Sequence, residues 1–411
     1  MNTRIDKSKL LIGTYCLQPN AQTEEHIKDI AECGIDLITC LYTRKRKLLD
    51  ALEHYHIGCI FTGAVPGWWG GGSEDKVMSE INPLSAYDES IVKFKDHPAI
   101  WGIDIGDEPS SLDYEHYANI INHIKEKFPK QMLYLNLYPY YAYVPENTDE
   151  KTKSQLGTFS YADYIDQYIE KIPLPYISYD FYVYACKNIG WMFENYRIVA
   201  EACRKTGREF WYIPQVNSKV KDIFMSENML RYQAYTALAY GATVINWACW
   251  TKGWWHNNVL DDDGKKTEQY EKLKKINFEL KNIGEVYMKY RNVNTHLLGF
   301  ENEPTFGKFP ELVSKKTVNT GFVRDLHAGK NDRLVVGEMV SRSGLGETAL
   351  VICNATDYLD ENHTTARVTF RADDCEVKLF SGEGYPVLRK SDKGVYSFDL
   401  ENTHGVIVTI K

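Results

Sequence analysis

The chain has 411 residues, of which 44% are hydrophobic and 25% are charged, so its composition is that of a globular protein and not of a disordered one. This length exceeds the usual range of a single domain, which favours one large domain joined to a smaller one. The formal net charge of -8 argues against a nucleic-acid partner, because phosphate binding relies on clustered Lys and Arg.

The sequence also indicates whether the chain spans a membrane, binds a metal, or carries an export signal. No apolar run reaches the roughly 18 residues of a membrane span, so we expect none. The first ten residues, MNTRIDKSKL, lack the apolar core of a signal peptide, so the chain as it stands is expected to be cytoplasmic, unless an export segment precedes it. The nine Cys form no CxxC pair, and Cys40 and Cys249 lie within apolar runs. We therefore expect buried reduced thiols, with no metal and no organic cofactor.

Short apolar runs alternate with amphipathic segments from residue 10 to about residue 290, as in βα repeats. Eight strands are expected, over Leu10–Cys16, Ile35–Tyr42, Ile57–Ala64, Ile100–Ile105, Met132–Tyr138, Tyr176–Tyr182, Phe210–Gln215 and Thr243–Trp250. Helices are expected between them, including Glu24–Cys33, Lys45–His54, Tyr114–Phe128, Met192–Thr206 and Glu227–Tyr240, with a final helix over about 269–290. No glycine-rich phosphate loop follows the first strand, so we predict a closed (β/α)8 TIM barrel and not an open doubly wound sheet.

The pattern then changes to short alternating strands separated by turn residues. They are expected over Leu334–Met339, Ala349–Asn354, Ala366–Phe370, Glu376–Phe380, Tyr396–Leu400 and Gly405–Ile410. We therefore predict a barrel domain over residues 1–292 and a small antiparallel β-sandwich domain over residues 293–411. The second domain is expected to support the barrel by packing, and a separate sugar-binding site is the alternative.

Acidic residues gather at the predicted carboxyl ends of two strands, the place where TIM barrels carry their active sites. The fourth strand ends with Asp104, Asp107 and Glu108, and the sixth ends with Asp180. Neighbouring carboxyl groups push at least one pKa upward. A carboxylic acid that stays protonated near neutral pH is what glycoside hydrolysis needs to protonate the leaving group. By the two-residue period, Asp104 shares a face with Glu108, where it would raise the pKa of the acid or act as a structural group.

Aromatic and amide side chains also follow the strands. Flat rings with one polar edge suit the faces of sugars, so a carbohydrate is the expected ligand. Rings expected to stack on a sugar include Trp68, Trp69, Trp250, Trp254 and Trp255. Side chains expected to bind sugar hydroxyls are Asn136, Tyr138, Tyr182 and Asn217.

The segment Gly106-Asp107-Glu108-Pro109 resembles the Asn-Glu-Pro signature of the clan A glycoside hydrolases. The run 238–242, Trp250 and the run 261–265 are similar to uncharacterised bacterial relatives of the family 42 β-galactosidase type, which also have a β-sandwich after the barrel. The resemblance covers most of the chain. It implies that Glu108 is the general acid/base and that Asp107 stands where an Asn binds the sugar 2-hydroxyl.

One position departs from the clan, which places a nucleophilic Glu at the end of strand seven, where this chain has Gln215. A neutral amide cannot form the glycosyl-enzyme ester. Asp180 is therefore the leading candidate for the second carboxylate, as nucleophile or as the base that activates water. The alternatives are that Gln215 replaces a Glu, by engineering or in a degenerate enzyme, or that the substrate supplies the missing group. Asp180 could also be a structural carboxylate that orients neighbouring Tyr or Asn side chains.

The sequence thus predicts a glycoside hydrolase that acts on an oligo- or polysaccharide without metal or cofactor. The alternative is a carbohydrate-binding barrel without catalysis, which Gln215 keeps open. A third class, a metal- or phosphate-handling barrel, would need His or Lys at the strand ends, and those ends contain none. The predicted catalytic residues are Glu108 and Asp180, and the predicted substrate-binding residues are Asp107, Asn136, Tyr138, Tyr182, Gln215, Asn217, Trp250, Trp68 and Trp254.

Overall fold

The computed structural model describes the chain from residue 4 to residue 411. Residues 44, 66–83, 86–92, 94–95, 143–154, 315–316, 345, 363, 373–374, 385 and 392 lie outside the described part. The expected sugar platforms Trp68 and Trp69 are among the residues outside it.

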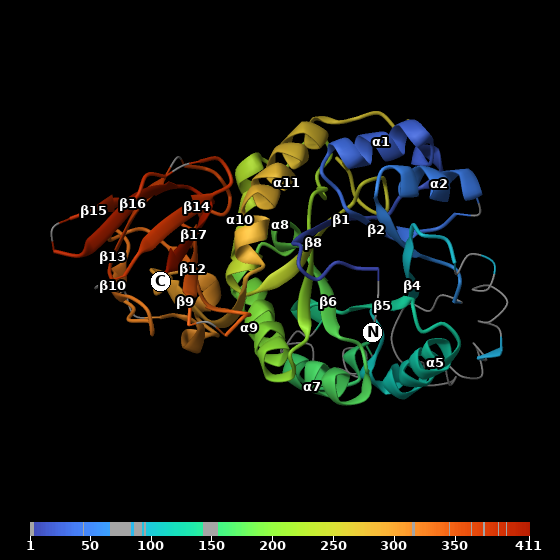
Figure 1. Cartoon of the computed structure of the whole chain (residues 1–411), viewed down its shortest axis with the longest axis horizontal. Coiled ribbons are helices and arrows are strands. Elements are labelled where there is room, and N and C mark those ends of the chain that lie inside the picture. The colour runs from blue at the N-terminus through green and yellow to red at the C-terminus, as the bar shows by residue number, and fades with distance from the viewer. Residues whose placement is uncertain are drawn as a thin grey trace.

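Eight parallel strands follow one another in sequence order around a closed barrel, which confirms the predicted architecture (Figure 1). The strands are β1 (Leu11–Tyr15), β2 (Leu37–Leu41), β3 (Gly58–Phe61), β4 (Ile100–Asp107), β5 (Met132–Leu137), β6 (Tyr176–Phe181), β7 (Glu209–Pro214) and β8 (Ala242–Ala248). The ring closes where β1 pairs with β8, with Thr14 beside Trp247. Strands buried on both faces read as continuous apolar runs, which is why the sequence located them.

Helices surround the strands in Figure 1. The longer described ones are α1 (Glu24–Glu32), α2 (Arg46–His54), α5 (Tyr114–Lys127), α7 (Tyr161–Lys171), α9 (Ile189–Thr206), α10 (Glu227–Ala239) and α11 (Glu268–Tyr287). Four of them begin after a hydroxyl side chain that accepts a hydrogen bond from a free backbone N–H of the first turn, namely Thr23, Ser160, Ser226 and Thr267. None of the described helices combines the length and the apolar character that a membrane-spanning helix needs.

The C-terminal part forms two antiparallel sheets, as predicted. One sheet has the order β14-β17-β12-β11-β9 and the other the order β10-β13-β16-β15. Their strands are β9 (Tyr290–Leu298), β10 (Arg324–His327), β11 (Leu334–Ser341), β12 (Thr348–Asn354), β13 (Thr365–Arg371), β14 (Val377–Ser381), β15 (Arg389–Lys390), β16 (Val395–Glu401) and β17 (Gly405–Ile410). The predicted division between residues 292 and 293 falls inside β9, and as a domain boundary it stays a prediction.

The five-stranded sheet is buried on both faces. Along β11 and β12, side chains alternate between the core of the barrel and the core of the sandwich: Val335 and Val351 belong to the first, and Val336 and Ile352 to the second. Figure 1 shows this sheet beside α10 and α11. The approach is close, because a Cβ added at Gly337 would lie 2.1 Å from the backbone oxygen of Ala239 in α10. The sandwich therefore packs directly on the helices of the barrel.

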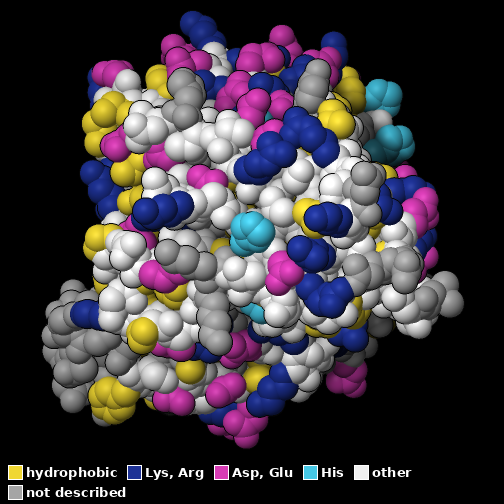
Figure 2. All heavy atoms as spheres, turned by 90° about the vertical axis from the view of Figure 1, so that its left-hand side faces the viewer, with side chains coloured by type: hydrophobic (Ala, Val, Ile, Leu, Met, Phe, Trp, Pro, Cys, Tyr) yellow, Lys and Arg dark blue, Asp and Glu magenta, His cyan; other side chains and the backbone are white. Residues whose placement is uncertain are grey.

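The surface of this C-terminal region carries mixed charges. Figure 2 shows acidic and basic side chains interspersed over this side of the molecule, with hydrophobic side chains only in scattered spots. Such a face is typical of a solvated surface and not of a large apolar interface.

Candidate active site

A cavity of about 640 Å³ lies at the carboxyl ends of the barrel strands. Three of its lining residues are acids, and they come from the two strands whose ends the sequence singled out. The described lining consists of Tyr15, Asp107, Glu108, Asn136, Tyr138, Tyr141, Ala142, Gln155, Asp180, Tyr182, Ile213, Trp254 and Trp255. Eight of the predicted site residues are therefore brought together: Asp107, Glu108, Asn136, Tyr138, Asp180, Tyr182, Trp254 and Trp255.

Asn136 joins two of the acids. Its Nδ2 donates to Oδ1 of Asp107 at 3.2 Å and to Oδ1 of Asp180 at 2.8 Å. The register of the sheet places these groups together, since Asp107 pairs with Asn136 and Asn136 pairs with Ser178, two residues before Asp180. The two carboxylate oxygens can be no further apart than the sum of these two bonds. Like charges at such a separation oppose the ionisation of both groups.

A hydrogen bond from Ser178 sets the orientation of the Asn136 amide. Ser178 Oγ donates to Asn136 Oδ1 at 2.9 Å, and Tyr134 lies 3.0 Å from Ser178 Oγ. This bond assigns the oxygen of the amide to Ser178 and its two N–H groups to the carboxylates. Both donors are therefore used inside the protein. The structure shows Asn136 holding Asp107 and Asp180, and its predicted binding of a sugar hydroxyl stays a prediction.

Burial and mutual repulsion raise the pKa values of the acids in this network. Burial, together with the charge of Asp107, raises the pKa of Asp180 to about 7. Burial also raises the pKa of Asp107, against hydrogen bonds from Asn136 and Tyr15 that favour its ionised form. Tyr15 OH donates to Asp107 Oδ2 at 3.3 Å, and Tyr141 OH to Asp180 Oδ2 at 3.5 Å. Asp180 thus changes charge near neutral pH, as a group with an acid–base role must.

Asp104 is not placed as the two-residue period predicted. The pairing of β4 with β5 shifts between Asp104 and Gly106, which interrupts the alternation of faces. A Cβ at Gly106 would meet the ring of Tyr117 on α5, so this position faces outward. Asp104 accepts hydrogen bonds from Thr62 and from the N–H of Gly106. Burial and then the charge of Asp107, not Glu108, raise the pKa of Asp104 to about 7.

Replacing Asp104 by Asn is expected to stabilise the protein at alkaline pH. The folded state holds the Asp104 proton up to about pH 7, whereas an unfolded Asp loses it near pH 4. Stability therefore falls as the pH rises through this window, and a neutral Asn avoids the loss. Denaturant unfolding should give Asp104→Asn a free energy of unfolding at least about 1 kcal/mol above that of the parent at pH 8, and no gain at pH 4. A destabilised variant at pH 8 would show instead that the hydrogen bonds of Asp104 hold its ionised form.

Glu108 follows β4 directly and lines the cavity. Its backbone has a φ of +46°, a region that residues with a Cβ rarely adopt, and its N–H donates to the carbonyl of Asn136 at 2.9 Å. Backbone strain of this kind concentrates at functional sites, where the surrounding structure holds it in place. Glu108 thus lines the cavity from a strained turn at the end of β4.

Aromatic rings form another part of the wall. The Tyr182 ring lies 5.6 Å from the Trp254 ring and 5.4 Å from the Trp255 ring, and the Tyr15 ring lies 5.8 Å from that of Trp254. Rings held at these angles by one another present fixed edges and faces to the cavity.

Gln215 lies outside the described lining and is 1% exposed. Its Nε2 donates to the carbonyl of Asn217 at 2.8 Å, and its backbone exchanges two hydrogen bonds with the Gln233 side chain. A carboxylate in this place would put an anion against the Asn217 carbonyl oxygen. The Gln215 Nε2 is therefore used inside the protein, while its Oε1 is buried without a hydrogen-bond partner among the described residues; the roles of Gln215 as a sugar ligand or as a substituted nucleophile stay predictions.

Two further predicted ligands are also buried outside the described lining. Asn217 is fully buried, and its Nδ2 donates to the backbone oxygen of Trp254 at 2.9 Å. Trp250 is fully buried and packs edge-on against Tyr270. Both therefore support the wall of the cavity from behind, Asn217 by fixing the chain at Trp254.

Sequence reasoning missed five residues of the lining: Tyr15, Tyr141, Ala142, Gln155 and Ile213. Tyr15 is the last residue of β1. Asp107 was selected because it lies at the carboxyl end of a barrel strand, and we call this criterion the strand-end rule. The same rule would have selected Tyr15. Tyr141 belongs to a short 3-10 helix, Tyr140–Ala142, in the loop after β5. No sequence signal indicates that this loop turns back over Asp180.

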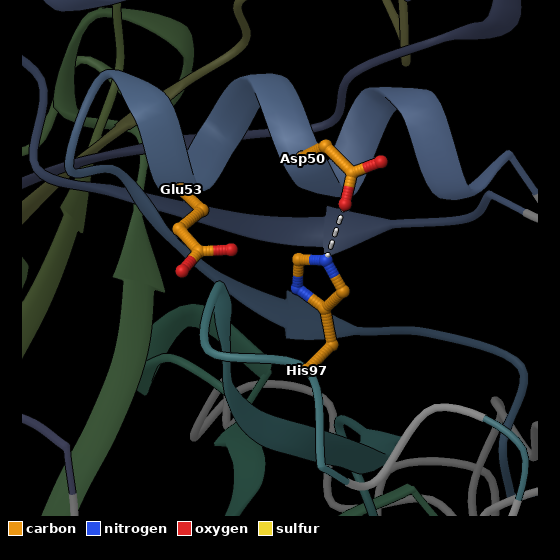
Figure 3. A group of neighbouring side chains, drawn as sticks. All are labelled: Asp50, Glu53 and His97. Carbon is orange, nitrogen blue, oxygen red and sulfur yellow. Dashed lines mark hydrogen bonds and ion pairs between the residues drawn. The ribbon is translucent and has the colours of Figure 1, made fainter.

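One described group has the composition of a metal site: Asp50 and Glu53 of α2 with His97 (Figure 3). It lies near the amino end of β4, away from the cavity. His97 Nδ1 accepts from the N–H of Ala99 at 3.2 Å, so the proton is on Nε2, which donates to Asp50 at 3.1 Å. Both ring nitrogens are thus occupied by hydrogen bonds, and the group is explained as a structural contact.

Removing the Asn136 amide should move the pH profile of any reaction in this cavity. The amide donates to both Asp107 and Asp180, which lowers both pKa values. In Asn136→Ala, both carboxyl groups should titrate at a higher pH, and the rate at neutral pH should fall about tenfold, as expected for a lost hydrogen bond to a charged group. Ser178→Ala should give the same shift with a smaller amplitude. A uniform loss of rate with an unchanged pH profile would indicate only damaged packing.

No protein-family model matches the chain, and no curated protein sequence matches it. A catalytic mutant of a family 42 β-galactosidase from G. stearothermophilus aligns over 100% of this chain and 99% of its own, with a TM-score of 0.53 and 8% identity. A glucosidase from Croceicoccus marinus aligns over 98% and 96%, with a TM-score of 0.44 and 10% identity. The catalytic module of a family 98 glycoside hydrolase from Streptococcus pneumoniae aligns over 100% of both chains, with a TM-score of 0.43 and 9% identity. At such identities the likeness is one of fold, and the β-galactosidase shares it along the whole chain.

Proposed function

We propose that this protein hydrolyses a glycosidic bond, with Glu108 and Asp180 as its catalytic carboxyl groups. The observation that carries the proposal is the meeting of three carboxyl groups, Asp107, Glu108 and Asp180, over one cavity at the carboxyl end of the barrel. Glycoside hydrolysis needs two such groups on the two sides of the bond, one as acid and one as nucleophile or base. The fold that this chain shares with a family 42 β-galactosidase supports the same class of reaction.

In the proposed reaction, Glu108 gives its proton to the oxygen that leaves the anomeric carbon as the glycosidic bond breaks. Asp180 acts from the other side in its ionised form. It either bonds to the anomeric carbon, to be displaced later by water that Glu108 deprotonates, or it takes the proton of the attacking water directly. The first route retains the anomeric configuration and the second inverts it, so proton NMR of the first product distinguishes them.

Asp107 has a supporting role in this proposal. Hydrogen bonds from Asn136 and Tyr15 favour its ionised form, and its charge raises the pKa of Asp180. An ionised carboxylate on the cavity wall also accepts hydrogen bonds from sugar hydroxyls. Three acids in one cavity repel anionic ligands, so we expect a neutral sugar to be bound in preference to an acidic one.

The aromatic wall supports carbohydrate as the substrate class. Tyr182, Trp254 and Trp255 pack against one another in the cavity and offer ring faces and edges for the C–H patches of a sugar. A cavity of about 640 Å³ is also within the usual size range of small-molecule sites and can hold more than one sugar ring.

The test is incubation of the protein with a panel of plant and algal oligosaccharides, with the products identified by mass. Release of a sugar by the parent protein, and its loss in Asp180→Asn, would support the proposal. Binding without release for every member, measured by calorimetry at several pH values, would support a carbohydrate-binding barrel instead. If the protein neither releases nor binds any sugar from a panel that covers neutral α- and β-linked sugars, the proposal is contradicted.

A further inference from the structure

A second pocket, of about 300 Å³, lies at the opposite end of the barrel from the carboxyl cavity. The residues around it belong to the end of α9, the amino ends of β7 and β8, the ends of α10 and α11, the first residues of β9 and the turn that follows β11, together with Lys7. Figure 1 shows α9 and β9 meeting where the barrel joins the sandwich. The hydrogen bond from Arg204 of α9 to Asn292 of β9, at 2.7 Å, crosses this junction.

The pocket is strongly basic, although the chain as a whole has a net charge of -8. Its lining contains five basic side chains, Lys7, Arg204, Arg208, Arg291 and Arg342, and one acid, Glu209. Glu209 is already used, since it pairs with Lys7 at 3.1 Å and accepts from Trp211 Nε1 at 3.2 Å. Four arginines therefore line one pocket, and none of them forms an ion pair with a described carboxylate. We call this site the arginine pocket.

Arg204 and Arg208 are half-buried, whereas Arg291 and Arg342 are exposed, and several other buried or half-buried arginines of the chain have acidic partners. Arg231 pairs with Glu279 at 2.6 Å, Arg197 with Glu194 at 2.7 Å, and Arg333 with Glu303 at 2.7 Å. A charge removed from water is expensive unless an opposite charge or several hydrogen bonds compensate it. In the arginine pocket, burial lowers the pKa of Arg204, against the charge of Glu201, which acts in the opposite direction.

The arginines are held in place with donors left over. Arg342 Nε donates to the carbonyl of Tyr290 at 2.9 Å, and Arg208 Nη2 to the carbonyl of Ile169 at 2.8 Å. Arg208 Nη1 is buried without a hydrogen-bond partner among the described residues. Backbone carbonyls thus orient the guanidinium planes of Arg208 and Arg342. Planar guanidinium groups match the oxygens of phosphate and sulfate, two donors at a time.

We propose that the arginine pocket binds a doubly charged oxyanion, phosphate or sulfate, either free or as the ester of a small sugar. The site is separate from the carboxyl cavity and does not depend on the glycosidase reaction. Because Arg204 and Arg208 come from the barrel and Arg291 and Arg342 from the C-terminal strands and their connecting turn, the bound anion would link the two parts of the chain. Binding is therefore expected to raise the thermal stability of the whole protein.

The experiment measures the melting temperature against increasing inorganic phosphate, sulfate and a hexose phosphate, with chloride at equal ionic strength as the reference. The parent protein should gain stability with phosphate or sulfate in a saturable manner, beyond the effect of chloride. A hexose phosphate that binds more tightly than inorganic phosphate would identify a sugar ester as the natural ligand, and the reverse order would identify the free anion.

The double variant Arg204→Gln/Arg291→Gln should lower the affinity for phosphate at least tenfold, since each lost charged hydrogen bond is worth more than about 1 kcal/mol. Arg367→Gln/Arg389→Gln is the matched control, because these arginines pair with Asp399 on the far sheet, and it should bind phosphate as the parent does. If the double variant does not fold, Arg291→Gln alone, at an exposed position, serves instead. Equal stabilisation by chloride, or unchanged affinity in the pocket variant, would overturn the proposal.

Discussion

Glu108→Gln is expected to lower the rate of sugar release by about a hundredfold to ten-thousandfold while sugar binding persists. The substitution keeps the shape of the side chain but removes the proton that the leaving oxygen must receive. The strained turn at Glu108 depends on its backbone, whose N–H donates to Asn136, and so should survive the exchange. The measurement pairs kcat on the best substrate of the panel with calorimetric affinity for the same sugar.

Glu115→Gln provides the matched control for this variant. Glu115 is exposed on the first turn of α5, seven residues from Glu108. Its replacement by Gln is the same chemical change, made outside the cavity. It should behave as the parent does. Full activity in Glu108→Gln would remove Glu108 from the mechanism and leave Asp107 and Asp180 as the catalytic pair. Joint loss of binding and melting temperature would point to a structural role for Glu108.

Asp180→Asn is expected to reduce kcat/KM at least about a hundredfold and to abolish the acidic limb of its pH profile. In the parent, burial and the charge of Asp107 raise the pKa of Asp180 to about 7. The ionised form is the one that attacks carbon or accepts a proton from water. Activity should therefore rise as the pH rises through about 7, and fall as Asp180 becomes protonated below it. Asn at this position still accepts the hydrogen bond from Asn136, so the fold should be retained.

The direction of this limb decides the role of Asp180. Activity that falls as the pH rises through about 7, and disappears in Asp180→Asn, would make Asp180 the proton donor and Glu108 or Asp107 its partner. Asp166→Asn is the control, since Asp166 is exposed on α7 and should leave both the rate and the profile unchanged. An Asp180→Asn variant with the full rate and profile of the parent would assign Asp180 to structure alone.

The strand-end rule was the most productive sequence argument for the site. It needs only the order of strands and the fact that parallel strands of a barrel deliver their carboxyl ends to one face. For that reason Asp107, Glu108 and Asp180, although 73 residues separate the first from the last, were expected in one place, and they line one cavity. The same rule would have added Tyr15 had the first strand been included.

The rule failed where local geometry decides the direction of a side chain. Asn217 and Trp250 stand just after strand ends, yet each is turned away from the cavity into the packing behind it. Asp104 was placed on the face of Glu108 by simple alternation, and a shift in the pairing of β4 with β5 ended that alternation. A sequence pattern carries the average period of a strand but not the position of a bulge.

The amino-acid sequence by itself determined the alternation of apolar runs and helices, and hence a barrel with its acids at one rim and a sandwich after it, because hydrophobic periodicity and burial are local properties. Only the tertiary structure decided which polar groups meet. The bridge of Asn136 between Asp107 and Asp180, the loop that brings Tyr141 onto Asp180, and the four arginines at the opposite end each join segments that are distant in the chain. Such contacts depend on strand register, loop path and the docking of the sandwich, and each of these is set by packing across the whole molecule.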